Sequence, residues 1–116
     1  MQEFRSKPTT RFAQGNAAKM SSIWTQEVRH AYDVLHQELG GEVVLLNLKT
    51  EHYFGLDPVG ARIWQVIGAT QSAEAVVNQL LQEYEVSEAQ LRGDVERLLG
   101  ELAAAGLVTV RDRQPA

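Results

Sequence analysis

The side chains best suited to acid–base or metal chemistry in this chain are its three histidines, His30, His36 and His52. No two of them have the H-x-x-x-H spacing that places two metal ligands on one face of a helix. The chain contains no cysteine, which excludes disulfides, thiolate ligands and a thiol nucleophile. It also has no G-x-S-x-G nucleophile elbow and no glycine-rich phosphate loop. We therefore predict a protein that is not an enzyme and that uses neither a metal nor a cofactor.

Charge is distributed unevenly along the 116 residues. Residues 1–22 carry four basic side chains and one acidic one, a net +3, so the formal −4 of the whole chain leaves −7 for the remainder. An acidic domain repels the phosphate backbones of nucleic acids, whose neutralisation by Lys and Arg supplies most of the binding energy. The composition therefore argues against a nucleic-acid partner and favours basic or neutral partners.

The N-terminal region differs from the rest of the chain in composition. Residues 1–22 are polar, lack apolar periodicity and include Pro8 and Gly15, which predicts a disordered tail. If Met20 is the true start, residues 1–19 are not native sequence; a basic arm for nucleic acid is the other alternative. No apolar run reaches the roughly 18 residues that span a bilayer, and no secretion signal is present. We expect a cytoplasmic protein with no membrane partner, in which residues 23–110 form one domain and residues 111–116 a C-terminal tail.

Three short strands are expected in the first half of this domain. Val34 to Leu39 leads into Gly40–Gly41, a dipeptide that accepts the positive φ angles of a tight hairpin. The following segment, Glu42 to Leu48, is rich in Val and Leu at consecutive positions, which predicts a strand covered on both faces. After a polar turn, residues 53–56 (Tyr-Phe-Gly-Leu) form a third strand, where Gly55 permits close approach of another backbone.

Two helices should follow the strands. Asp57 and Pro58 have the residue types of an N-cap and a first helical position, and the first helix runs to about Ile67. Gly68 is the predicted left-handed residue that ends it. The second helix begins at about Ser72, and its apolar residues recur at helical spacing: Ala73, Val76, Val77, Leu80, Leu81 and Tyr84.

The third helix has the clearest start signal in the sequence, because Ser87 and Gln90 match the S-x-x-Q capping box. Gly106 ends it, and residues 107–110 are apolar enough for a short wing strand. These elements predict an α+β fold, a winged helix-turn-helix in which a three-stranded antiparallel sheet is followed by three helices. The buried stripe of the third helix comprises Leu91, Val95, Leu98, Leu99 and Leu102.

A DNA-binding winged helix would present this third helix to the major groove. Its acidic side chains outnumber its two arginines, so net repulsion from phosphates is expected. Gly93 and Gly100 lie on one face of the helix, which indicates either a poorly optimised solvent face or close approach of a partner. The strand at residues 53–56 is open to two interpretations as well, core with ordinary edge decoration or an edge that accepts a peptide by strand addition.

Residues 41–64, which read GEVVLLNLKTEHYFGLDPVGARIW, resemble the signature of the PqqD-like family, the RiPP recognition elements. A hairpin strand, a Tyr-Phe-Gly-Leu strand, an Asp-Pro helix start and a glycine before Ile-Trp occur in the family's order. The likeness covers about residues 33–110 and includes the second helix, Asp94-Val95 and the closing segment from Leu102 to Leu107.

The resemblance implies a domain that binds the leader segment of a ribosomally synthesised precursor peptide and presents it to a modifying enzyme, such as a radical SAM protein or a leader peptidase. In this family the leader adds as a strand to the third β-strand, and its apolar side chains fill a groove against the third helix. Carried onto this chain, the peptide-binding residues are His52, Tyr53, Phe54, Gly55 and Leu56 in the strand and Leu91, Asp94, Val95 and Leu98 in the helix.

The acidic balance of the domain adds the hypothesis that Asp94 and Glu101 recognise a basic residue of the leader. The pathway is open between a PQQ-type, a lasso-peptide and another type, and the likeness to the broader family favours one other than PQQ. The oligomeric state, monomer or dimer, is also open. The alternatives from other classes are a winged-helix nucleic-acid-binding protein and a homo-oligomerisation module that pairs through its own strand edge.

Overall fold

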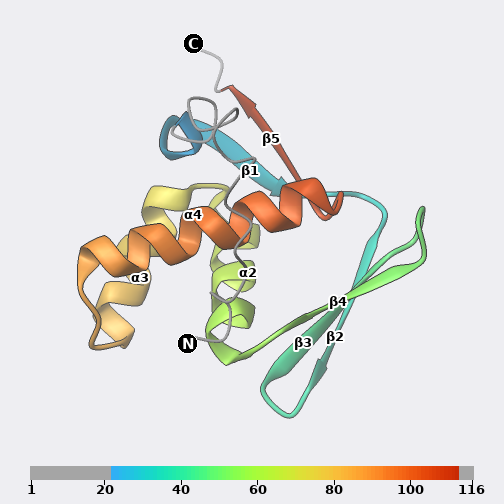
Figure 1. Cartoon of the computed structure of the whole chain (residues 1–116), viewed down its shortest axis with the longest axis horizontal. Helices are drawn as coiled ribbons and strands as arrows, with labels where there is room; N and C mark the ends of the chain where they lie inside the picture. The colour runs from blue at the N-terminus through green and yellow to red at the C-terminus, as the bar shows by residue number, and fades with distance from the viewer. Residues whose placement is uncertain (1–21, 113–116) are drawn as a thin grey trace.

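A computed structural model describes residues 22–112 of the chain (Figure 1). The predicted N-terminal tail, apart from Ser22, and residues 113–116 of the predicted C-terminal tail lie outside the described residues. The elements in chain order are η2 (Ser22–Thr25), β1 (Gln26–His30), β2 (Val34–Leu39), β3 (Glu42–Asn47), β4 (His52–Leu56), α2 (Pro58–Thr70), α3 (Ala73–Glu83), α4 (Glu88–Ala104) and β5 (Val108–Asp112).

The three helices form one cluster in which α3 packs against both α2 and α4. The sheet of β2, β3 and β4 extends to one side of this cluster, and the ribbon of β1 and β5 lies on another (Figure 1). The predicted α+β class, with a three-stranded antiparallel sheet followed by three helices, is therefore confirmed. The core lies between the helices and the inner face of the sheet.

The sheet has the order β2-β3-β4, with both pairs antiparallel. Gly40 and Gly41 make the predicted tight hairpin between β2 and β3, with φ angles of +60° and +89°. The prediction that β3 is covered on both faces is wrong. Val43 and Leu45 are buried against the helices. Val44 and Leu46, on the other face, are only half-buried, and Leu48 is exposed. Among the described residues, α2 packs on the inner face, against β3 and β4, and no helix covers the outer face.

The pairing of β1 with β5 was not foreseen from the sequence. The predicted wing segment does form a strand, β5, which continues to Asp112 and pairs antiparallel with β1 rather than with the three-stranded sheet. In β1 only Val28 is buried, so the strand lacks the apolar alternation by which strands are recognised. Its position depends on contacts made elsewhere, including the bond from the Val28 N–H to the Gln71 carbonyl.

Helix α2 starts as predicted and ends later than predicted. The Asp57 carboxylate accepts the Gly60 N–H at 2.8 Å, as an N-cap does. The left-handed residue at the C-terminus is Gln71, with φ +57°, and not Gly68, which lies within the helix. Gly68 is needed for another reason, because a Cβ there would lie 2.6 Å from the His30 ring. The glycine therefore allows β1 to approach α2 closely.

Helices α3 and α4 begin at the predicted N-caps. The hydroxyl of Ser72 accepts the Ala75 N–H and that of Ser87 accepts the Gln90 N–H, each at 3.1 Å. Gly106 follows α4 with φ +76°, as predicted. The predicted apolar stripe of α4 is fully buried, but Tyr84 is not part of the stripe of α3, because it lies after the helix and its side chain is exposed.

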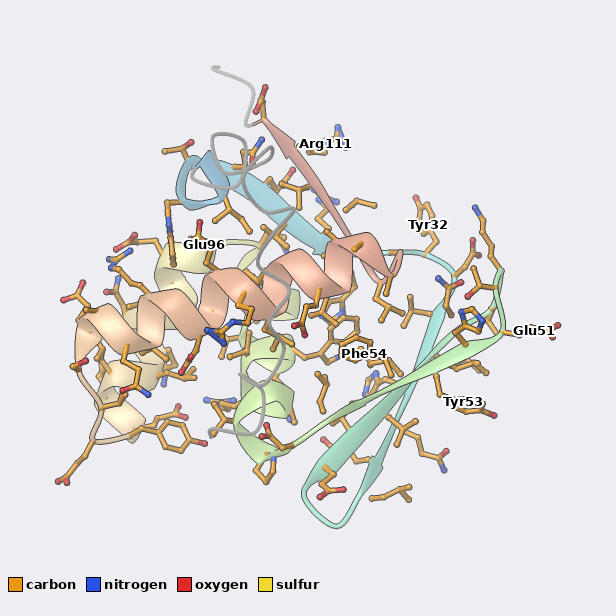
Figure 2. All side chains as sticks on the ribbon, viewed as in Figure 1. Tyr32, Glu51, Tyr53, Phe54, Glu96 and Arg111 are labelled. Atoms are coloured by element: carbon orange, nitrogen blue, oxygen red, sulfur yellow. The ribbon has the colours of Figure 1, made fainter. Side chains whose placement is uncertain are left out.

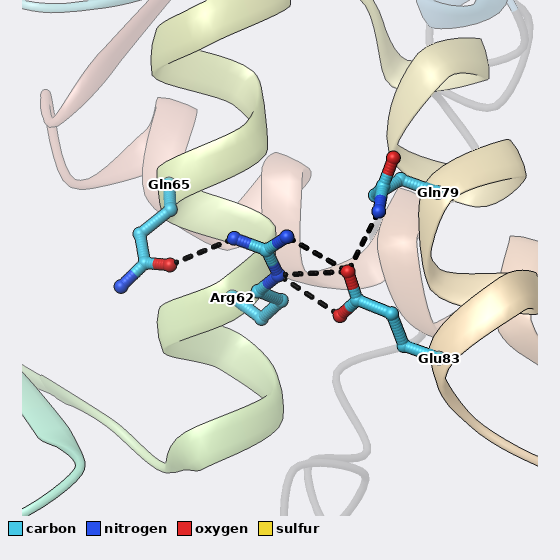
Figure 3. A network of polar contacts seen from close by, with 4 residues as sticks. All are labelled: Arg62, Gln65, Gln79 and Glu83. Carbon is cyan, nitrogen blue, oxygen red and sulfur yellow. Dashed lines mark hydrogen bonds and ion pairs between the residues drawn. The ribbon is translucent and has the colours of Figure 1, made fainter.

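Ion pairs join neighbouring helices at the surface. Arg62 of α2 donates to the Glu83 carboxylate of α3, with the shortest contact at 2.7 Å, and Gln79 donates to the same group (Figure 3). The hydrogen bond from Arg62 lowers the pKa of Glu83 to about 2. Arg92 of α4 likewise donates to Glu74 of α3 at 2.6 Å. Such exposed pairs contribute little free energy but restrict how the helices rotate about one another.

Candidate functional site

Strand β4 is an edge strand, because no other strand pairs with its outer side in the part of the chain that the structure describes. Successive residues of an inner antiparallel strand bond alternately to its two neighbours. The Leu48 N–H donates to the Asp33 carbonyl at 2.8 Å, so the even-numbered residues of β3 bond toward β2 and the odd-numbered ones toward β4. The odd-numbered residues of β3 pair with the even-numbered residues of β4. Tyr53 and Gly55 therefore direct their N–H and C=O groups to the open edge.

A groove of about 360 Å³ lies beside this edge, between β4 and the C-terminal end of α4. Phe54 points from β4 toward the helices, whereas Tyr53 points away on the other side of the strand (Figure 2). Because successive side chains of a strand alternate in this way, an added strand would place every second side chain over the groove. The groove is lined by Asn47, Thr50, His52, Tyr53, Phe54, Ala104, Ala105 and Leu107.

The two walls of the groove are joined by the buried side chain of Asn47. Its amide N–H donates to the Ala105 carbonyl at 2.9 Å, at the end of α4. Its amide oxygen accepts the N–H groups of Lys49 and Thr50, at 2.9 and 3.2 Å, in the turn that leads into β4. A Cβ at Gly106 would lie 2.9 Å from the same side-chain nitrogen, so the chain after α4 passes very close to Asn47.

The peptide-binding residues expected from the family resemblance fall into two groups in the structure. Those of the strand are accessible, since Tyr53, His52 and Gly55 are exposed and Phe54 is half-buried. Those of the helix are mostly inaccessible, and of them only Glu101 is half-exposed. The buried members do not line the groove: Leu56, Leu91, Asp94, Val95 and Leu98.

Asp94 differs from the other buried members because it is charged. The residue is 8% exposed, its Oδ2 atom has no hydrogen-bond partner among residues 22–112, and its Oδ1 atom lies 3.7 Å from Nη1 of Arg97. That Nη1 atom is also buried without a hydrogen-bond partner. Asp94, Glu101 and the groove residue Ala105 are seven and four residues apart, which places them along one side of α4. Unsatisfied buried polar atoms are rare in native structures.

The residues that the sequence did not identify are those contributed by turns and by the helix end. Asn47 is the only one of them with a detectable signal, since it is a polar residue at the inward-facing position of an apolar strand. Thr50, Ala104, Ala105 and Leu107 have ordinary residue types, and only the fold brings them to one groove.

No group of three or more His, Cys, Asp or Glu side chains in residues 22–112 could hold a metal ion. Of the three histidines, His36 and His52 are exposed on the sheet. His30 is half-buried and stacks on the Trp64 ring, with ring centroids 3.5 Å apart. Its Nε2 lies 2.9 Å from the Trp64 carbonyl oxygen, to which it donates, and burial lowers the pKa of His30. Within the same residues, no helix is long and apolar enough to cross a bilayer.

Comparisons with known proteins identify the family. The family model described as coenzyme PQQ synthesis protein D (PqqD) matches residues 42–108. The solved structure of TbiB1 in complex with the TbiA(beta) leader peptide is similar at 35% identity, covering 69% of this chain and 93% of that chain, with a TM-score of 0.66. A lasso peptide synthetase B1 complexed with the leader peptide is similar at 25% identity, covering 72% and 98%, with a TM-score of 0.66. No curated protein matches the chain. Because the family model spans more than half of its residues, this chain belongs to the PqqD family.

Proposed function

We propose that this protein binds the leader segment of a ribosomally synthesised precursor peptide and presents it to a modifying enzyme, without doing chemistry itself. The observation that carries the proposal is the open edge of β4 beside the groove, where the backbone groups of Tyr53 and Gly55 have no strand partner among residues 22–112. Both similar solved structures are complexes with leader peptides, which supports the same role here.

Strand addition at β4 gives affinity through main-chain hydrogen bonds and specificity through side-chain pockets. The leader backbone bonds to Tyr53 and Gly55, so affinity depends on their N–H and C=O groups and little on leader sequence. Every second leader side chain enters the groove beside Phe54, where the small side chains of Ala104 and Ala105 leave space for an apolar group. Leu56, Leu91, Val95 and Leu98 belong to the hydrophobic core and do not line this groove.

Two acidic groups add selectivity for charge in this proposal. Asp94 and Glu101 lie along the side of α4 that leads to the groove, and the folded part of the chain carries an excess of negative charge. Glu101 is half-exposed and can meet a basic residue of the leader directly, whereas the buried Asp94 can act on that residue only through its charge. The likeness to a lasso peptide synthetase B1 favours a lasso-peptide pathway, with a leader peptidase as the partner enzyme, over a PQQ-type pathway with a radical SAM partner.

The experiment is a pair of substitutions at Gly55, followed by fluorescence anisotropy with a labelled leader peptide. The probe is the TbiA(beta) leader. Gly55→Pro removes an N–H that points to the open edge and leaves the bonds between β3 and β4 intact, so affinity should fall at least about tenfold. Gly55→Ala keeps the N–H and has open space for its methyl group, so affinity should change less than about threefold.

Equal affinity of the Gly55→Pro and Gly55→Ala proteins would contradict strand addition at β4. Sizing chromatography over a range of protein concentrations tests the competing role of this edge, pairing with a second copy of the chain. A dimer that Gly55→Pro converts to a monomer, together with no leader binding by the unmodified protein, would replace the proposal with self-association.

A further inference from the structure

Helix α4 has a solvent face on the side opposite its buried leucine stripe. At about 100° per residue, the middle of this face spans about 60° around the helix and consists of Ala89, Gly93, Gly100 and Ala104. Ala89, Gly93 and Ala104 are exposed, and a Cβ at Gly93 would meet no atom within 4 Å. The face is therefore accessible to a further chain segment.

The small size of these side chains is unusual, because the exposed side of a helix normally carries long polar and charged residues. Each glycine also makes a helix less stable than alanine would. Gly93 and Gly100 therefore bring no benefit to the helix itself. What they do permit is the close approach of another backbone to the helix axis.

Acidic side chains border the solvent face of α4 on both sides. Glu96 lies at one border and the half-exposed Glu101 at the other. Glu96 is half-buried, burial raises its pKa, and it makes no ion pair within residues 22–112. The last turn of α4 contains no basic residue, although the C-terminus of a helix carries a partial negative charge. The face therefore favours a basic occupant.

The two arginines of α4 already have acidic partners. Arg92 forms ion pairs with Glu74 at 2.6 Å and with Glu88 at 3.0 Å. Arg97 lies 3.7 Å from the Asp94 carboxylate. The positive charge that Glu96 attracts must consequently come from another part of the chain or from another molecule.

The chain has a basic segment that joins the domain beside this helix. Residues 1–21 carry four basic side chains and one acidic one, a net +3, whereas residues 23–116 carry −7. The segment leads into η2, where Ile23 is buried and the ring of Trp24 lies under the Arg92 guanidinium, 4.7 Å from it. The solvent face extends about 17 Å from Gly93 to Ala104, and 21 residues can span about 70 Å. The segment can therefore reach the whole face, and its tether keeps it at a high effective concentration there.

A second copy of the chain fits this face less well. The four acidic and two basic side chains of α4 leave a net −2, so two such faces would repel one another. A helix of this length offers about 26 by 10 Å, or about 260 Å². A stable dimer buries about 800 Å² on each partner. Charge and area both favour a short tethered segment.

We propose that the solvent face of α4 is the docking site of the chain's own basic N-terminal segment, residues 1–21, and that the leader peptide displaces this segment. Its Arg and Lys side chains meet Glu96 and Glu101, and its backbone passes close to Gly100. Ala104 belongs both to this face and to the leader groove, so the segment and the leader compete for the same end of α4. The displacement rests on the proposed leader binding, whereas the docking does not.

Paramagnetic relaxation measured by NMR on the full chain tests the docking. The chain contains no cysteine, so Ala13→Cys provides a single site for a nitroxide label. Without leader, the amide signals of Gly93 and Gly100 should broaden at least about threefold more than those of the Gly40–Gly41 hairpin, and added salt should reduce the difference. Glu96→Lys should abolish the difference. Glu85→Lys, the same change at an exposed residue of the turn before α4, is the matched control and should preserve it.

A second measurement tests the displacement. Saturating TbiA(beta) leader should remove the extra broadening at Gly100. Replacement of Arg5, Lys7, Arg11 and Lys19 by Gln should increase the affinity for this leader at least about threefold in fluorescence anisotropy, because the competing segment loses its charge.

Equal broadening of α4 and the hairpin in the unmodified protein would overturn the docking, as would broadening that survives Glu96→Lys. Extra broadening that persists at saturating leader would overturn the displacement and leave the proposed function intact. Failure of the unmodified protein to bind the leader would overturn the proposed function and the displacement, while the signals without leader still decide the docking. Broadening of α4 that requires a high protein concentration would assign the face to a second copy. Unchanged amide spectra of the core report that the variants are folded.

Discussion

The side-chain amide of Asn47 in β3 donates to the carbonyl of Ala105 at the end of α4, 58 residues later in the chain, at 2.9 Å. The same side chain accepts two N–H groups from the turn that leads into β4. One residue therefore sets both the conformation before the edge strand and the distance between that strand and the helix. The groove beside β4 depends on this link.

Replacing Asn47 with Ala should lower both the free energy of unfolding and the affinity for leader peptide. The change leaves the Ala105 carbonyl and the N–H groups of Lys49 and Thr50 without their partner, which costs about 1–3 kcal/mol. Urea unfolding and leader anisotropy measure the two effects. Asn47→Asp keeps the oxygen that accepts from the turn but loses the N–H that donates to Ala105. Its effect should therefore measure the contribution of the link to α4 without that of the turn. Gln79→Ala is the surface control. If Asn47→Ala lowers the free energy of unfolding and the leader affinity no more than this control does, the role of Asn47 is contradicted.

Gly106 and Gly93 should respond in opposite directions to substitution by Ala. Gly106 has φ +76°, and its Cβ would lie 2.9 Å from the side-chain nitrogen of Asn47, so Ala should lower the free energy of unfolding by at least about 1 kcal/mol. Gly93 lies within α4 with open space around it, so Ala should raise that free energy by about 0.5–1 kcal/mol. Urea unfolding of both proteins is the measurement, and effects of the same sign would count against this reading of the two glycines.

Asp94→Asn should reduce affinity for a leader that contains a basic residue, and the reduction should shrink as salt is added. The substitution keeps the shape of the side chain and removes its charge, so it tests the electrostatic contribution alone. Anisotropy titrations at low and high ionic strength should show a several-fold difference at low salt only. Glu101→Gln should have a smaller effect, because Glu101 is half-exposed. Glu83→Gln, on α3, is the control. If Asp94→Asn binds the leader as tightly as the unmodified protein at both salt concentrations, charge recognition by Asp94 is excluded.

Stability should fall as the pH drops through the titration of His30. Burial lowers the pKa of this histidine below its usual value of 6.5. The folded state therefore favours the neutral ring, and its contribution is fully present above pH 6.5 and is lost as pH falls through the lowered pKa. Urea unfolding from pH 7.5 to 5 should show this loss, and His30→Phe should remove that component while keeping a ring on Trp64. An identical pH dependence in the two proteins would argue against His30 as its source.

The local signals of the sequence were sufficient for most element boundaries. Asp57, Ser72 and Ser87 are recognisable as N-caps because the hydrogen bonds that define a cap span only three residues. The same holds for the Gly40–Gly41 hairpin. Gly68 shows where this reasoning fails, since a glycine near a helix end indicates either a cap or a close contact, and the contact here comes from His30, far away in the chain.

The sequence by itself determined the hairpin strands β2 to β4, the three helices, the absence of cysteine chemistry and the family, because these depend on composition, periodicity and short-range bonds. Only the tertiary structure decided which strands pair, that β1 joins β5, and that Leu91, Val95 and Leu98 belong to the core and do not line the groove. It also decided which face of the sheet stays open. Apolar periodicity identifies a face but not what covers it, and the bond between Asn47 and Ala105 forms only after β3 and α4 have packed.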